Sequence, residues 1–117
     1  MKLPLILTGV GLAQLKSPKF LGLDHLNLGS KEEVYLVSNT ITVTKSRAII
    51  LSSGTLNTIN GLTDGSILIL QAQSVTIADN TGNLRLVSNF QMDTRFDTLT
   101  LLRDRNVWIE LARSNNQ

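Results

Sequence analysis

The stretch Ser66-Ile67-Leu68-Ile69-Leu70-Gln71, followed by Ser74-Val75-Thr76-Ile77, decides the fold class of this chain. The second run alternates apolar and polar residues, which is the period of a β-strand with one buried face. The first run is apolar at successive positions, which predicts a strand that is covered on both faces. Neither run shows the 3.6-residue period of an amphipathic helix.

Similar runs continue on both sides of this stretch. They occupy residues 34–37, 40–44 and 47–51 before it, and 83–87, 89–92, 97–102 and 106–111 after it. Turn signals such as Asn60-Gly61 and Asp64-Gly65 separate them. Short strands at intervals of roughly 8–12 residues predict an all-β fold, either a small sandwich or a β-solenoid-like module. We therefore expect residues 31–117 to form a single β domain.

A short internal echo also occurs in this region. Leu36-Val37-Ser38-Asn39 recurs as Leu86-Val87-Ser88-Asn89. Repeated β-units are common in stacked architectures, but a four-residue identity also arises by chance in a biased composition. The echo leaves both explanations open.

Residues 1–30 differ from the rest because they contain both prolines and show no clear alternation. This region is predicted to be an extended N-terminal arm and a loop. A basic start and an apolar stretch resemble a secretory signal, but no small-x-small cleavage site follows at Ala13. The stretch is also shorter than the roughly 20 apolar residues that span a bilayer. Its apolar residues have no expected strand partner and are predicted to anchor the arm to a partner: Leu3, Leu5, Ile6, Leu7, Val10 and Leu12.

The amino-acid composition excludes several classes of function and site. Aromatic residues make up 4% of the chain, so the core is expected to be aliphatic and modest, and a homo-oligomer would complete it. The net charge of +2 is spread along the chain without a basic cluster, which argues against nucleic-acid binding. Cysteine is absent, which excludes disulfides and thiolate metal sites. No cofactor or membrane partner is expected.

The second half of the chain resembles a β-module of bacteriophage tail-fibre and other virion structural proteins. The resemblance covers roughly residues 53–115 and rests on the order and spacing of several motifs. These are Ser53-Gly54-Thr55-Leu56-Asn57-Thr58-Ile59-Asn60-Gly61, Asp64-Gly65-Ser66-Ile67-Leu68-Ile69-Leu70, Thr81-Gly82-Asn83-Leu84-Arg85-Leu86 and Asn106-Val107-Trp108-Ile109-Glu110-Leu111-Ala112-Arg113-Ser114. One departure is Asp104-Arg105-Asn106, where the family tends to have Asp-Gly. Asn106 is expected to supply the left-handed turn there.

The resemblance implies a trimer-prone β-module in a virus particle, without catalysis. A capsid decoration (cement) protein is one such component; it would bind the major capsid protein and clamp the shell with its arm. A tail-fibre, baseplate or spike component is the alternative. A fibre usually has a long shaft in the same polypeptide, so a small module with an apolar arm favours decoration. The expected location is the virion, assembled in the host cytoplasm.

An enzyme, such as a depolymerase domain, is the third class of function, and its candidate residues are few. His25 is the only histidine and lies among leucines, where it lacks the nucleophile that hydrolysis requires. Asp93 and Asp97 could flank a glycosidic bond, although pairing with the nearby Arg95 or solvation explains them equally well. The turn at residues 79–83 offers oxygen ligands for calcium but lacks the charge count and distal glutamate of an EF-hand loop. The chain is therefore predicted not to be an enzyme.

Trp108 is the remaining candidate. It alternates with Val107, Ile109 and Leu111, so it points to the opposite face of its strand. If those three residues face the core, Trp108 faces a neighbouring subunit, where large aromatic residues dominate interface energies. A sugar-stacking platform is the competing interpretation. Trp108 is thus predicted to lie in the trimer interface.

Overall fold

The computed structural model describes residues 26–116, and every regular element in this part of the chain is a β-strand. The all-β prediction is confirmed, and the stacking is that of a small β-solenoid-like module. The predicted arm, apart from its last few residues, lies outside the described residues. Within residues 26–116 there is no helix that is long and apolar enough to cross a membrane.

Eleven short strands follow one another in this region. They are β2 (Glu32–Val34), β3 (Thr40–Thr42), β4 (Arg47–Ile50), β5 (Gly54–Leu56), β6 (Thr58–Asn60), β7 (Ile67–Ala72), β8 (Val75–Ile77), β9 (Leu84–Arg85), β10 (Phe90–Met92), β11 (Thr98–Asp104) and β12 (Val107–Ser114).

Parallel pairing stacks the first strands into successive coils. β2, β4 and β7 lie in parallel on one side, β3 and β6 on a second, and β5 and β8 on a third. Paired positions are 16, 18, 21 or 22 residues apart in the sequence, as between Glu32 and Ala48 or between Arg47 and Ile69. The 50-residue echo does not match this spacing, so it does not reflect the stacking of coils.

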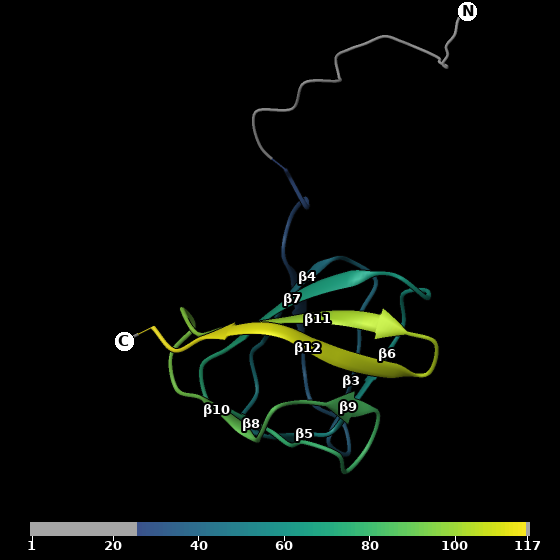
Figure 1. Cartoon of the computed structure of the whole chain (residues 1–117). Coiled ribbons are helices and arrows are strands. Elements are labelled where there is room, and N and C mark those ends of the chain that lie inside the picture. Colours follow the sequence, from purple (N-terminus) through teal and green to yellow (C-terminus); the bar gives the residue numbers. More distant parts are fainter. Residues whose placement is uncertain (1–25, 117) are drawn as a thin grey trace, which may run out of the picture.

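The last strands reverse direction and close one end of the stack. β10 pairs antiparallel with β8, and β11 pairs antiparallel with β7. The β11–β12 hairpin then extends the largest sheet, in which β12 also pairs in parallel with β9 (Figure 1). The result is a six-stranded sheet with the order β2-β4-β7-β11-β12-β9.

The inward side chains of the three sheets meet in one core. It is aliphatic apart from Phe90 and Trp108, as the low aromatic content requires. Its fully buried members come from every sheet and include Ile41, Leu56, Ile59, Leu68 and Leu70.

Two strands were missed in the sequence. No strand was expected between residues 51 and 66, where Asn60-Gly61 marks a turn, but this region forms β5 and β6 at two neighbouring sides of one coil. Gly61 is required where this coil meets the one before it. Its φ is +102°, and a Cβ at this position would overlap the carbonyl oxygen of Val43.

The turn between β11 and β12 also differs from expectation. Arg105 has the positive φ of 57°, whereas Asn106 was expected to adopt it. The Arg105 N–H donates to the Asp64 carboxylate at 2.7 Å, so a contact with another loop holds this conformation.

The sheet formed by β3 and β6 has no third strand, and the side chain of Asn83 lies beside β6. Its amide Nδ2 donates to the Ile59 carbonyl at 2.7 Å, and its Oδ1 accepts the Ile59 N–H at 2.9 Å. The side chain therefore pairs with β6 as a peptide group of a neighbouring strand would.

We expect Asn83→Ala to lower the free energy of unfolding by about 2 kcal/mol, because the Ile59 N–H loses its acceptor and the Ile59 carbonyl keeps only the donor from Trp108. Urea denaturation of the purified protein would measure this change. Asn106→Ala is a suitable control, since that side chain is exposed and its backbone does not have a positive φ. Equal stability of the two variants would show that water replaces the Asn83 amide without cost.

Candidate functional site

Trp108 lies in the core of its own protomer, and the prediction that it faces a neighbouring subunit is wrong. Its side chain is fully buried, and its Nε1–H donates to the Ile59 carbonyl at 3.3 Å. The Arg103 guanidinium carbon lies 5.9 Å from the centre of its ring. A ring enclosed in this way cannot reach a second subunit or stack on a sugar.

The alternation of β12 was read correctly, but its two faces were assigned the wrong way round. With Trp108 inside, the outward positions are Val107, Ile109 and Leu111. The Trp108 face also carries Glu110, so the local pattern favours Val107, Ile109 and Leu111 as the buried face. The structure places Trp108 inside instead, where β12 pairs with β11.

Aliphatic residues gather on the outward face of the six-stranded sheet. In β7 the core residues Leu68 and Leu70 are fully buried, so Ile67 and Ile69, which alternate with them, point outward. Leu102 pairs with Ile67 on one side and with Ile109 on the other. We call the following residues the outer sheet face: Ile67, Ile69, Leu102, Ile109 and Leu111.

The outer sheet face remains partly open to solvent. Ile67, Ile69, Leu102 and Ile109 are only half-buried and lie outside the core cluster. Leu111, which follows Ile109 at a β-bulge, is 52% exposed. The sequence predicted that β7 is covered on both faces, and within the protomer only its inner face is buried.

Charged residues frame the outer sheet face. Arg85 continues the row of Ile67, Leu102 and Ile109 and is exposed. Arg47 pairs in register with Ile69 on the other side. An apolar centre with a charged rim is the usual composition of a protein–protein interface.

Asp97, one of the two carboxylates considered for catalysis, accepts hydrogen bonds from backbone N–H groups. Asp97 is fully buried and accepts the N–H groups of Asp93 at 2.7 Å, Thr94 at 3.3 Å and Asn116 at 2.7 Å. Burial alone would raise the pKa of Asp97, but these donors outweigh it and lower the pKa. Asp97 therefore fixes the turn before β11 and ties the last described residues to it.

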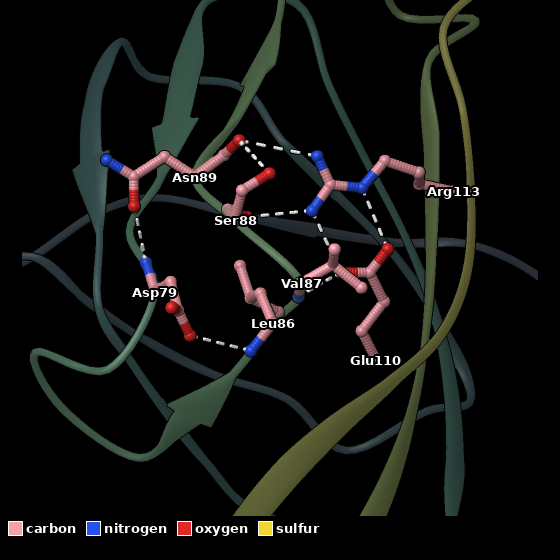
Figure 2. Close-up of polar contacts among 7 residues, drawn as sticks. All are labelled: Asp79, Leu86, Val87, Ser88, Asn89, Glu110 and Arg113. Carbon is pink, nitrogen blue, oxygen red and sulfur yellow. Dashed lines mark hydrogen bonds and ion pairs between the residues drawn. The ribbon is translucent and has the colours of Figure 1, made fainter.

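The turn at residues 79–83 is held by its own hydrogen bonds. The Asp79 carboxylate accepts the Leu86 N–H at 2.8 Å, and the Asp79 N–H donates to the Asn89 side chain at 2.8 Å (Figure 2). Among residues 26–116 there is no group of three or more His, Cys, Asp or Glu side chains that could hold a metal ion.

Glu110 and Arg113 form the main ion pair of this region (Figure 2). Arg113 donates to both Glu110 oxygens, at 2.7 and 2.8 Å, and to the carbonyls of Ser88 and Asn89. Its guanidinium lies 4.6 Å from the centre of the Phe90 ring. The Arg113 hydrogen bond lowers the pKa of Glu110, against the effect of its burial. These groups use their hydrogen bonds in joining the 86–89 loop to β12.

The other predicted interface residues, Leu3, Leu5, Ile6, Leu7, Val10 and Leu12, lie outside the described residues, as does His25. Sequence reasoning missed the polar residues that organise the fold, namely Asn83, Asp97 and Arg113. The sequence around these three residues gives no clear indication of their role, because their side chains bind backbone groups that the sequence pattern does not identify. Among residues 26–116, the outer sheet face is the aliphatic surface described above that suits a partner. Comparison with protein-family models, with curated proteins and with solved structures finds no match to this chain.

Proposed function

We propose that this chain is a non-enzymatic structural protein of bacteriophage particles that works as a homotrimer. The capsid decoration role, in which the protein stabilises the shell by binding the major capsid protein, is the form we favour. The resemblance of residues 53–115 to virion β-modules supports the context. The observation that carries the proposal is the partly open outer sheet face.

The trimer would complete the burial that the protomer lacks. Each Å² of apolar surface removed from water contributes roughly 25 cal/mol, so the side chains of the outer sheet face favour association when they pack together. The fully buried members of the core are enclosed without a partner, which makes the protomer a folded building block. Arg85 and Glu33 at the margins of the sheet offer opposite charges that set the orientation of neighbours.

We expect Ile109→Lys to convert the trimer to a monomer, because the variant places a charge at the centre of the outer sheet face. The side chain points away from the protomer core, so the variant should fold. Light scattering during size-exclusion chromatography would measure the mass of the wild type near three chains and that of the variant near one.

Thr55→Lys is the matched control, since Thr55 is exposed on the sheet formed by β5, β8 and β10. This variant should keep the wild-type mass. A wild type that is monomeric at micromolar concentration would refute the trimer, and a trimeric Ile109→Lys variant would refute this surface as its interface.

The virion role is tested by the number of copies in purified particles. Quantitative mass spectrometry against the major capsid protein should give hundreds of copies per particle if the chain decorates the shell. A few copies, or about a dozen, would instead identify a tail component. Absence from the particles would refute both.

A further inference from the structure

The two margins of the six-stranded sheet carry different groups. β9 is the edge strand at one margin, and β2 is the edge strand at the other. Four strands lie between them, so the margins are roughly 24 Å apart at the usual spacing of strands. A side chain on one margin therefore cannot reach the other margin of its own protomer, but it can reach another copy.

The β9 margin presents Arg85 and Val87 to solvent. Arg85 is exposed, and Val87 is 84% exposed, the highest value among the large hydrophobic residues of the described chain. The Glu110 carboxylate accepts the Val87 N–H at 3.0 Å, and Arg113 donates to the Ser88 carbonyl at 2.7 Å, so the loop is held in place (Figure 2). Loops that a rigid scaffold positions in this way often carry binding residues.

The β2 margin carries a groove of about 540 Å³, which we call the β2 groove. Its lining includes Glu33, Tyr35 and Val37. Tyr35 is 61% and Val37 72% exposed, and Glu33 is also exposed. The described lining contains two carboxylates and no lysine or arginine. The β2 groove is therefore suited to a basic side chain that has an apolar neighbour.

Arg85 and Glu33 both have unused capacity for an ion pair. Among residues 26–116 neither of them takes part in one. Within this part of the chain the hydrogen bonds of Arg85 use Nη1 alone, which donates to two carbonyls of its own loop, so Nη2 and Nε can still bind a carboxylate. The Glu32 carboxylate, in contrast, already accepts two backbone N–H groups. Glu33 is thus the carboxylate of the groove that suits Arg85.

We propose that a second copy of this chain occupies the β2 groove and places its β9 margin there. Its Arg85 pairs with Glu33, and its Val87 packs against Val37. The contact joins two different margins, so each copy contacts two neighbours, as in a closed ring. β9 pairs with β12, and the contact therefore borders the outer sheet face. This inference rests on the proposed trimer and names the contact that closes it.

Charge reversal tests the ion pair. Glu33→Arg and Arg85→Glu should each raise the concentration at which the trimer dissociates by about tenfold or more, because each variant brings two like charges together. The double variant restores opposite charges and should return to within about threefold of the wild type. Light scattering over a dilution series would measure all four proteins. A double variant that loses as much as the two single variants combined would overturn the pairing.

Disulfides between copies test the contact itself in the full-length chain, which lacks cysteine. Val87→Cys and Val37→Cys copies with different tags would be co-expressed, purified and mildly oxidised. We expect a mixed disulfide that forms about tenfold faster than the one between Val87→Cys and Thr55→Cys copies. Thr55 is the matched control because it is exposed on a different sheet.

Equal rates for the two pairs, with a trimeric wild type, would overturn this contact and leave the trimer standing. A wild type that is monomeric at micromolar concentration would overturn both. Faster disulfides between two Val87→Cys copies would also overturn the contact, since two β9 margins would then face each other.

Discussion

Replacing Trp108 with alanine is expected to lower the free energy of unfolding by about 3–5 kcal/mol, the usual cost of truncating a large buried aromatic side chain. The ring is fully buried among the side chains of the core cluster, and the substitution also leaves the Ile59 carbonyl without its Nε1–H donor. Total stability of a domain is typically about 5–15 kcal/mol. The variant should therefore melt at a much lower temperature, and the proposed trimer should be lost only as the variant unfolds.

Urea denaturation followed by circular dichroism would measure this effect. Trp108→Phe keeps most of the buried ring and should lose less stability than the alanine variant. Leu111→Ala, on the exposed side of the same strand, should change protomer stability by about 0.5 kcal/mol or less. If Trp108→Ala kept its wild-type stability and lost only the trimer, Trp108 would be an interface residue after all.

Trp108 shows which features of a strand can be predicted from the sequence. The alternation within β12 placed Trp108 on one face and Ile109 on the other, and the structure has this arrangement. The choice of the inner face depends on pairing with β11, which in turn pairs with β7. The local pattern of β12, with Glu110 on the Trp108 face, favours the opposite choice. The fold class was therefore predictable, whereas the buried face of β12 was not.

The polar contacts that stabilise the coils could not be predicted either, because they also depend on how distant segments pair. Asn83 is an ordinary turn residue in the sequence, yet it pairs with Ile59, which is 24 residues away. Asp97 was considered beside Asp93 and Arg95, but the described structure gives it backbone partners, including the N–H of Asn116. Side chains that satisfy distant backbone groups have no signature in spacing.

Asp97→Ala is expected to lower the free energy of unfolding by roughly 3 kcal/mol at neutral pH, because several buried backbone donors lose a charged acceptor. The donors are the N–H groups of Asp93, Thr94 and Asn116. Asn116 should also loosen, since its N–H loses the Asp97 acceptor and its side-chain amide donates to the Phe96 carbonyl of the same turn. Amide hydrogen exchange at residues 93–97 would report that local change.

The effect of Asp97→Ala should depend on pH. The pKa of Asp97 is lowered in the folded protein, so the unfolded chain binds a proton more readily than the folded chain does. The stability contributed by the carboxylate is then complete above the ordinary aspartate pKa of roughly 4 and is lost as the pH falls through the lower folded-state value. Glu32 and Glu110 shift in the same direction, so the wild type should lose stability over the same acidic range.

Urea denaturation of the wild type and of Asp97→Ala at neutral pH and near pH 2 separates the charge of Asp97 from its packing. The difference between the two proteins should be largest at neutral pH and should shrink at low pH, because the protonated carboxyl group accepts hydrogen bonds from N–H groups less strongly. Asp97→Asn keeps the shape and one acceptor oxygen, so its stability should be intermediate at neutral pH, and its difference from Asp97→Ala should be nearly independent of pH in this range. An undiminished difference near pH 2 would mean that the loss comes from the cavity, and the hydrogen-bonding role assigned to the carboxylate would be wrong.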